Sequence, residues 1–138
     1  MKKYIIDTNA LISFVTDRNL EQQVKIAQLF EQAAQLKTFI FCHQHVLTEF
    51  IYVMDKVYRI PENEIRQMVA DFIEMPGIEV VSEIDFPGVF ALWPATITDF
   101  GDAVIASVCR SIKGSAIVTF DREFIDSLKL LKLNYQML

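Results

Sequence analysis

Short apolar runs alternate with longer segments of helical periodicity along this chain. The short runs, rich in β-branched and aromatic residues, predict strands at residues 3–6, 38–42, 78–81 and 116–119, and a final edge strand within the last eight residues. Apolar residues three and four apart predict helices at 21–36, 44–59, 61–75, 86–92 and 98–113, and a short helix after Asp121. Strands that alternate with segments long enough for crossovers predict an α/β fold of three layers, with a mostly parallel central sheet flanked by helices.

The helical stripes predict which side chains face the core. Thr98 is the expected N-cap of helix 98–113, and Gly114 its end. Thr8-Asn9 is expected to form a turn after the first strand. The stripes of the three longest central helices comprise Leu47, Phe50, Ile51, Met54 and Tyr58; Ile65, Met68, Val69, Phe72 and Ile73; and Ile105, Val108, Cys109 and Ile112.

Composition limits the class of protein. The 138 residues are 52% hydrophobic and contain no linker, repeat or charge run, which favours a single domain over residues 1–138. At this length roughly two thirds of the unfolded surface can be buried without a disulfide. Cys42 and Cys109 lie far apart in the sequence, and no apolar run approaches the ~20 residues of a membrane span. The first apolar run meets Asp7 after three residues, too soon for an export signal. We therefore expect a cytoplasmic protein without membrane contact.

Charge is distributed unevenly around a net value of −5. Residues 60–102 carry nine acidic side chains and one basic side chain, whereas the segments on either side are slightly basic. An acidic total argues against a dedicated nucleic-acid binder, because phosphate backbones attract basic surfaces. That objection weakens if cations neutralise some of the carboxylates.

Five carboxylates lie near the predicted carboxyl ends of the strands, where parallel sheets form their active sites. Asp7 ends the first strand, Asp121 follows the strand at 116–119, Asp99 and Asp102 fall in the first turn of a helix, and Glu49 lies beside the stripe of helix 44–59. Singly, each has an ordinary structural explanation. If four of them lie within ~5 Å of one another, each pair costs roughly 3 kcal/mol, so the cluster must be protonated or hold cations. Oxygen ligands without paired Cys or His favour Mg²⁺ or Mn²⁺.

These acids sit in segments that resemble the PIN domain. The segments are Ile-Ile-Asp7-Thr8-Asn9, Leu-Thr-Glu49-Phe-Ile, Asp99-Phe-Gly-Asp102 and Val-Thr119-Phe-Asp121. Their order and spacing match over essentially the whole chain, and the compact VapC-like toxins of type II toxin–antitoxin systems are the most similar branch. The resemblance implies an endoribonuclease that uses Mg²⁺ or Mn²⁺ to hydrolyse RNA, with a small antitoxin as partner.

The resemblance also assigns residues. It implies that Asp7, Glu49, Asp102 and Asp121 are catalytic metal ligands, with Asp99 as an auxiliary one, and that Asn9 and Thr119 orient carboxylates or contact phosphate. Exposed apolar side chains on helices between residues 21 and 73 would serve a homodimer or an antitoxin groove. Arg18, Arg110, Lys113 and Arg122 are candidates for gripping flanking phosphates, although a solvated surface charge is the simpler reading of each.

Four alternatives stay open. Cys42, His43 and His45 suggest a zinc site, although no fourth ligand follows at a recognisable spacing. A strand-terminal Asp also resembles aspartyl-phosphate phosphatases, which place a second Asp where this chain has Asn9. A non-catalytic interaction module on the same fold is a third alternative, and a housekeeping nuclease for RNA or DNA is a fourth. The scattered glycines exclude a Gly-rich phosphate loop.

Overall fold

The structure, a computed structural model, describes residues 1–136, which form a five-stranded sheet between two groups of helices. The strand order is β3-β2-β1-β4-β5, and every neighbouring pair is parallel. The predicted three-layer α/β fold is confirmed, with a sheet that is fully parallel over the described residues. The strands are β1 (Lys2–Ile6), β2 (Thr38–His43), β3 (Ile78–Val81), β4 (Ser115–Val118) and β5 (Tyr135–Gln136).

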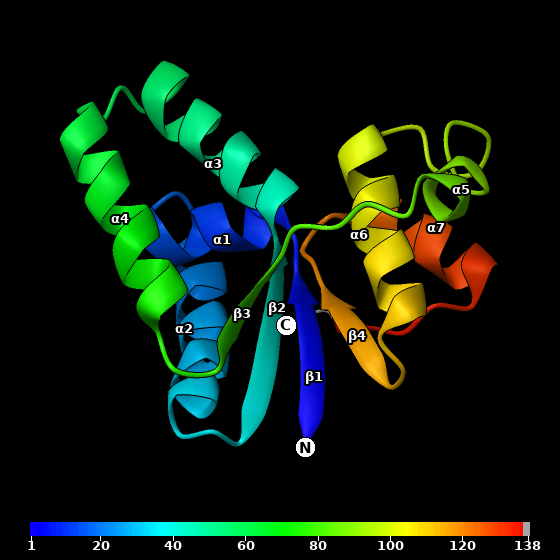
Figure 1. Cartoon of the computed structure of the whole chain (residues 1–138). Helices are drawn as coiled ribbons and strands as arrows, with labels where there is room; N and C mark the ends of the chain where they lie inside the picture. The colour runs from blue at the N-terminus through cyan, green and yellow to red at the C-terminus, as the bar shows by residue number, and fades with distance from the viewer. Residues whose placement is uncertain (137–138) are drawn as a thin grey trace.

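Helices cover the two faces of the sheet in sequence order. Figure 1 shows α1 to α4 on one side of the strands and α5 to α7 on the other. Right-handed crossovers require this division, because the chain leaves β1 toward β2 and β3 in one direction and later builds β4 and β5 in the other. The helices are α1 (Thr8–Val15), α2 (Leu20–Ala34), α3 (Gln44–Lys56), α4 (Glu62–Glu74), α5 (Phe86–Phe90), α6 (Phe100–Ser111) and α7 (Arg122–Leu131).

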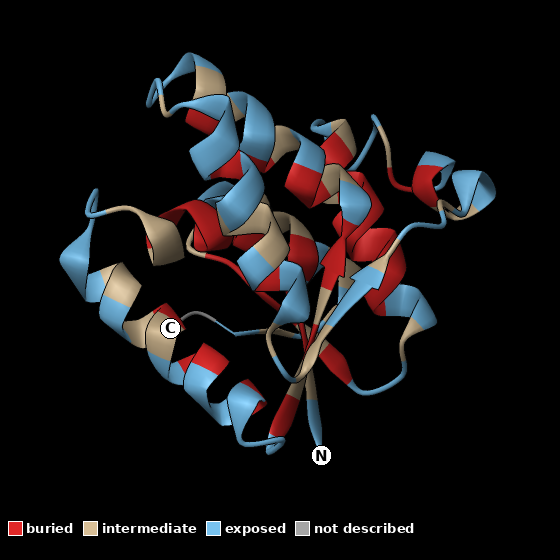
Figure 2. Ribbon diagram, turned by 60° about the vertical axis from the view of Figure 1, so that its left-hand side comes forward, coloured by how far each residue is buried: buried red, intermediate tan, exposed pale blue. Residues whose placement is uncertain are grey.

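The hydrophobic core lies on both faces of the central strands. Ile5, Ile6 and Ile117 are completely buried, and the helices contribute Phe30 and Phe50 among other large side chains. In Figure 2 the buried positions gather where helices meet the strands, while the outer helix faces are exposed. Strands buried on both faces explain why their sequences are continuous apolar runs rather than alternating ones.

One helix escapes the sequence-based prediction. Residues 8–15, expected to begin with a turn, form helix α1 directly after β1. Its start is signalled by Asp7, whose side chain caps the helix, and its inner face is Ala10, Leu11 and Ile12. Eight residues that are mostly apolar show little periodicity, so this buried helix resembled the continuation of a loop.

Other differences concern boundaries and exposure. Helix α6 is capped by Asp99 rather than Thr98, so it begins at Phe100. Ile51, Tyr58 and Ile73, expected in the core, are 43%, 37% and 44% exposed. Helices α3 and α4 pack against each other at the edge of the molecule, and part of each apolar stripe therefore meets solvent (Figure 1).

The expected last strand is confirmed as β5, although residues 137–138 of that segment lie outside the described residues. Within residues 1–136, none of the helices combines the length and the apolar character that crossing a bilayer requires.

Candidate active site

The strand order changes direction at β1 and β4, and two of the acidic residues lie there. Asp7 directly follows β1, while Asp121 comes shortly after β4. The register pairs Ile6 with Val118, and the Asp7 N–H donates to the Val118 carbonyl at 3.4 Å. In open parallel sheets, ligands bind at such a switch point beyond the carboxyl ends of the strands.

Three aspartates at this edge are also helix caps. Asp7 Oδ1 accepts from the N–H of Ala10 at 2.8 Å and so caps α1. Asp99 Oδ1 caps α6, and Asp121 Oδ1 caps α7 through the N–H groups of Glu123 and Phe124. Each cap uses one carboxylate oxygen, Oδ1, and is favoured by the positive helix N-terminus. The caps therefore hold the three aspartates in place through Oδ1, and Oδ2 of each takes no part in capping.

Glu49 reaches the same edge from helix α3. Its Oε1 accepts from the Thr8 hydroxyl at 2.8 Å, a contact between residues 41 positions apart. His45, one helical turn earlier, lies with Nε2 3.4 Å from the same oxygen. Two side chains from different elements thus hold a carboxylate that the helical pattern placed beside the core stripe.

A cavity of about 210 Å³ brings these acids together. No Lys, Arg or His is among the described residues that line it. The apolar wall comes from Ile12 and Val53, so the polar lining is dominated by carboxylates. The lining residues are Asp7, Thr8, Asn9, Ile12, Glu49, Val53, Asp99, Asp102 and Asp121.

Burial and mutual repulsion raise the pKa values of two of these acids. Asp7 is 3% exposed, and burial raises its pKa to about 6 although hydrogen bonds from Thr119 and Ala10 act in the opposite direction. Burial also raises the pKa of Asp102 to about 8, with further contributions from the charges of Asp99, Asp7, Asp121 and Glu49. A negative charge is therefore costly in this cavity unless a cation compensates it.

The neighbours Thr119 and Asn9 take different positions. The Thr119 hydroxyl is fully buried, accepts from the Asp121 N–H at 3.0 Å and hydrogen-bonds Asp7, so it links the two strand-end aspartates. Asn9 is exposed and lines the cavity, and its carbonyl accepts from Arg18 at 2.8 Å.

The donor set suits a hard divalent cation, because every polar side chain around the cavity offers oxygen and four of the acids surround Asp102 electrostatically. The carboxylates line the cavity without converging on one point. No group of three or more His, Cys, Asp or Glu side chains in residues 1–136 is gathered closely enough to hold an ion as positioned. A ligand role for these acids stays a prediction.

The zinc alternative finds no support in the described residues. The Cys42 thiol is buried beside the His43 carbonyl, and burial raises its pKa to about 12, so it is a poor source of thiolate. His43 is engaged at both ring nitrogens, by the Glu83 carbonyl and by the His45 N–H. His45 lies instead beside Glu49. The three side chains have separate partners.

Sequence reasoning missed Thr8 and His45 as contacts of Glu49. His45 was within reach of a pattern argument, since residues i and i+4 face each other on a helix. Thr8 left no signal, because its contact with Glu49 depends on how α1 packs against α3. Gly101 was missed too: a Cβ there would lie 2.6 Å from His45 Nε2 and 3.1 Å from Asp99 Oδ1, so a larger residue would displace the His45 ring from its present position.

Comparison with known proteins identifies the family of the chain and other proteins that share its fold. A search of curated protein sequences found no match. Two solved structures are similar at 16% identity, which shows a shared fold. VapBC2 from Rickettsia felis, crystallised with a DNA fragment from its promoter, gives a TM-score of 0.67 over 97% of each chain. VapC20 from Mycobacterium tuberculosis, a toxin that cleaves the sarcin–ricin loop, gives 0.66 over 90% of this chain and 94% of that one. The family model for the PIN domain matches residues 4–127, and the chain belongs to that family.

Proposed function

We propose that this chain is a divalent-metal-dependent endoribonuclease, a single PIN-like nuclease domain over residues 1–138 that hydrolyses RNA phosphodiester bonds. The observation that carries the proposal is that Asp7, Glu49, Asp102 and Asp121, from four parts of the sequence, all line one cavity at the switch point of the sheet. Membership of the PIN family supports it. The fold shared with VapC20, whose substrate is an RNA loop, favours RNA over DNA.

In this proposal the four convergent acids are the catalytic residues and hold Mg²⁺ or Mn²⁺, with Asp99 as an additional ligand. When bound, such an ion polarises the phosphodiester and eases deprotonation of the attacking water. The caps of α1, α6 and α7 hold three aspartates in place through Oδ1 and leave Oδ2 for the cation. Thr119 fixes Asp7 relative to Asp121, and Asn9 contacts phosphate at the mouth of the cavity.

The biological setting we propose is a type II toxin–antitoxin pair in the cytoplasm. Both similar structures are toxins of this kind or complexes that contain one. The two cysteines, Cys42 and Cys109, are buried free thiols, which suits a reducing compartment.

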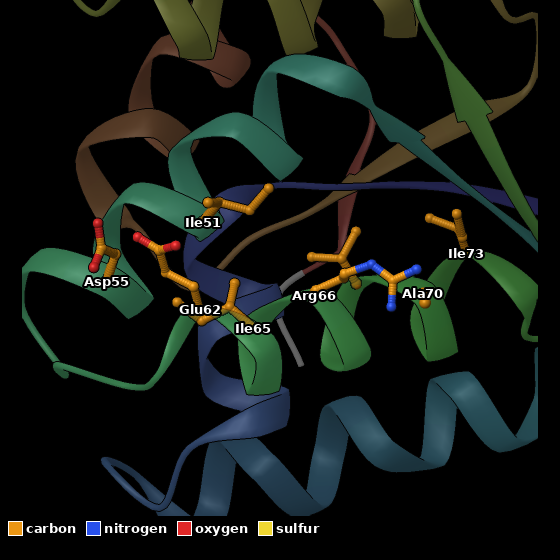
Figure 3. A pocket seen from close by; sticks show the side chains of 8 residues that line it. Ile51, Asp55, Glu62, Ile65, Arg66, Ala70 and Ile73 are labelled. Atoms are coloured by element: carbon orange, nitrogen blue, oxygen red, sulfur yellow. The ribbon is translucent and has the colours of Figure 1, made fainter.

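The antitoxin surface in this proposal is an apolar groove of about 480 Å³ between α3 and α4. Figure 3 shows Asp55 and Glu62 at one end, Ile73 at the other, and Arg66 between them. A groove between two helices with apolar walls fits the apolar face of an amphipathic helix. The acidic end calls for a basic residue on that helix.

For the homodimer we propose a different surface. Phe86 and Phe90 of α5 are 50% and 58% exposed, and their rings lie 5.8 Å apart, with Trp93 6.3 Å beyond Phe90. Contiguous exposed aromatic side chains are typical of protein interfaces. This surface lies on the opposite side of the sheet from the α3–α4 groove (Figure 1).

Cleavage of a mixed RNA pool in Mg²⁺, Mn²⁺ or EDTA tests the catalytic proposal. We expect cutting with either metal, none in EDTA, and loss of activity by at least roughly 100-fold in Asp7→Asn and Asp102→Asn. Asp126→Asn is the matched control, since it removes the same charge from an exposed position of α7 outside the cavity. Cutting in EDTA, or active Asp7→Asn, would contradict the mechanism. Folded, metal-binding protein that cuts nothing would favour the non-catalytic module, and cutting of DNA alone the housekeeping nuclease.

A further inference from the structure

A second cavity opens beside the acidic one and has a different chemistry. It measures about 420 Å³, within the range of small-ligand sites. Asn9 and Asp121 belong to the lining of both cavities, so the two are adjacent. The remaining lining consists of Arg18, Asn19, Gln22 and Phe120, and we call this the Arg18 cavity.

Arg18 is exposed, and three hydrogen bonds hold its guanidinium in place. Its Nε and Nη2 donate to the hydroxyl of Ser13 at 3.1 and 2.8 Å, and Nη2 also donates to the Asn9 carbonyl at 2.8 Å. Ser13 is fully buried and passes its own hydrogen to Gln22 Oε1 at 2.9 Å. These bonds use Nε and Nη2, so Nη1 is the edge of the guanidinium that they leave available.

Arg18 is therefore an exposed charge, as expected, whose guanidinium is ordered by the tether. A guanidinium that is already ordered loses less conformational entropy when it binds an anion, and the two N–H groups of Nη1 can donate to phosphate oxygens. Its position also influences the acidic cavity, where its charge lowers the pKa of Asp7.

The other groups of the Arg18 cavity suit a nucleobase. Phe120 is partly exposed at the end of β4 and offers an aromatic face. Asn9, Asn19 and Gln22 carry side-chain amides. Asn19 Oδ1 caps α2 and Gln22 Oε1 accepts from Ser13, so these two side chains offer chiefly their NH₂ donors. Single-stranded RNA is bound by this combination of a cation for the backbone, aromatic stacking and amides for base edges.

The opposite flank of the acidic cavity lacks this combination. A cavity of about 250 Å³ there shares Asp99, Asp102 and Asp121 with the acidic one. It adds hydroxyls and Glu123, and none of its described lining residues is Lys or Arg. A polyanion therefore meets a fixed cation on only one side of the carboxylates.

We infer that the Arg18 cavity is a nucleotide subsite, which takes one nucleotide of the RNA adjacent to the scissile bond, with its phosphate on Arg18 and its base against Phe120. The identification of the ligand as RNA rests on the proposed function. Independently of that function, the groups that line the cavity suit a ligand that carries both a phosphate and an aromatic base.

The first test measures binding of 5′-AMP, adenosine and inorganic phosphate to the full chain in Mg²⁺. Binding is detected through the NMR signals of Arg18 Nε–H and the Phe120 ring. We expect 5′-AMP to shift both signals and to bind about tenfold more weakly to Arg18→Gln and to Phe120→Leu. Arg59→Gln is the matched control, because it removes the same guanidinium from an exposed position beyond α3. Unfolding temperatures identify any variant that fails to fold, and the Phe120 variant retains every bond of Arg18.

Three results would overturn the inference. Inorganic phosphate that binds as tightly as 5′-AMP would mean a simple anion site. An effect of Arg59→Gln equal to that of Arg18→Gln would mean unspecific charge attraction, and 5′-AMP that leaves both signals unmoved would mean no subsite.

Cleavage kinetics separate this inference from the proposed function. If both hold, Arg18→Gln and Phe120→Leu each raise KM for RNA about tenfold, and kcat of Phe120→Leu stays within about twofold, because the Phe120 ring binds substrate without touching the reacting phosphorus. Binding of 5′-AMP without any RNA cleavage would preserve the subsite and refute the nuclease. Cleavage with an unchanged KM in Arg18→Gln would preserve the nuclease and refute the subsite.

Discussion

Single residues at the acidic cavity have two tasks because a carboxylate has two oxygens. Asp7, Asp99 and Asp121 each satisfy a helix N-terminus with Oδ1. Asp102 lies in the first turn of α6, and Asp99 takes up its backbone N–H. The charge of Asp102 is the one that four other acids oppose. The protonation state of Asp102 therefore depends most strongly on the charges of the surrounding acids.

We predict that Asp102 makes the metal-free protein less stable as pH rises. Its pKa of about 8 in the folded state lies above the ordinary 3.8, so between pH 5 and 7 the folded chain binds more protons than the unfolded chain. The free energy of unfolding then falls with pH, by up to about 1.4 kcal/mol per pH unit for one full proton, and partial exposure to solvent reduces this slope. Asp102→Asn should flatten the slope in denaturant titrations in EDTA.

Asp126→Asn is the control for this measurement and should keep the wild-type slope. Equal slopes in Asp102→Asn and wild type would contradict the raised pKa. Added Mg²⁺ should flatten the slope of the wild-type protein, since a cation that binds the ionised carboxylates favours their deprotonated, folded form.

At the scale of elements, helix N-termini build much of this site. Helices α1, α6 and α7 begin at acidic caps, and the N-terminal half of α3 supplies Glu49. Parallel strands followed by helices bring such N-termini to one edge of the sheet. A carboxylate at each start is stable through the helix dipole, and the approach of the helices then creates the repulsion that the proposed cation would relieve.

Substitution at Asp121 should separate the cap of α7 from the charge. Asn caps a helix about as well as Asp, whereas Ala does not. We predict that Asp121→Asn keeps the free energy of unfolding near the wild-type value, while Asp121→Ala lowers it by about 1 kcal/mol further. Both variants should lose RNA cleavage to a similar extent, in assays run beside thermal denaturation. An Asn variant that cleaves RNA normally would show that the charge is dispensable.

At the scale of the whole molecule, helix α3 belongs to two surfaces. Glu49 and Val53 face the acidic cavity, while Ile51 and Asp55 line the groove against α4. The spacing of four residues within each pair and of two between them places the pairs on different helix faces. A partner in the groove would therefore contact the same helix that carries Glu49.

We predict that Ile51→Lys weakens inhibition by the proposed antitoxin without affecting RNA cleavage. The partner for this test is a protein encoded by a neighbouring gene that inhibits RNA cleavage when it is co-expressed. Its Kd should rise at least about tenfold, because a charge replaces an apolar side chain in the groove wall. Tyr52→Lys is the control, since Tyr52 is 63% exposed and outside the groove.

Light scattering distinguishes the antitoxin groove from the dimer surface. Phe90→Ser should convert a dimer to monomers and leave antitoxin binding intact, and Ile51→Lys should do the reverse. If Ile51→Lys also dissociates a dimer, the groove is occupied by a second copy of the chain.

Pattern arguments reached most of the fold but only part of the site's geometry. Strand ends located Asp7 and Asp121, and the stripe of α3 placed Glu49 off the core face. The pattern missed α1, because a short, mostly apolar helix has too little periodicity. It assigned Ile51 and Ile73 to the core, since a stripe shows which face is apolar and not whether another element covers all of it.

The alternation of strands and helices, and with it the parallel sheet and the edge at which the acids gather, can be read from the amino-acid sequence alone. Those properties follow from local periodicity and from the handedness of crossovers. Only the tertiary structure decided that Thr8 holds Glu49, that Ser13 and Asn9 hold Arg18, and that Asp102 carries the strongest repulsion. These contacts depend on distances between side chains in space. The packing of the helices sets those distances, and the separation of the residues along the chain does not predict them.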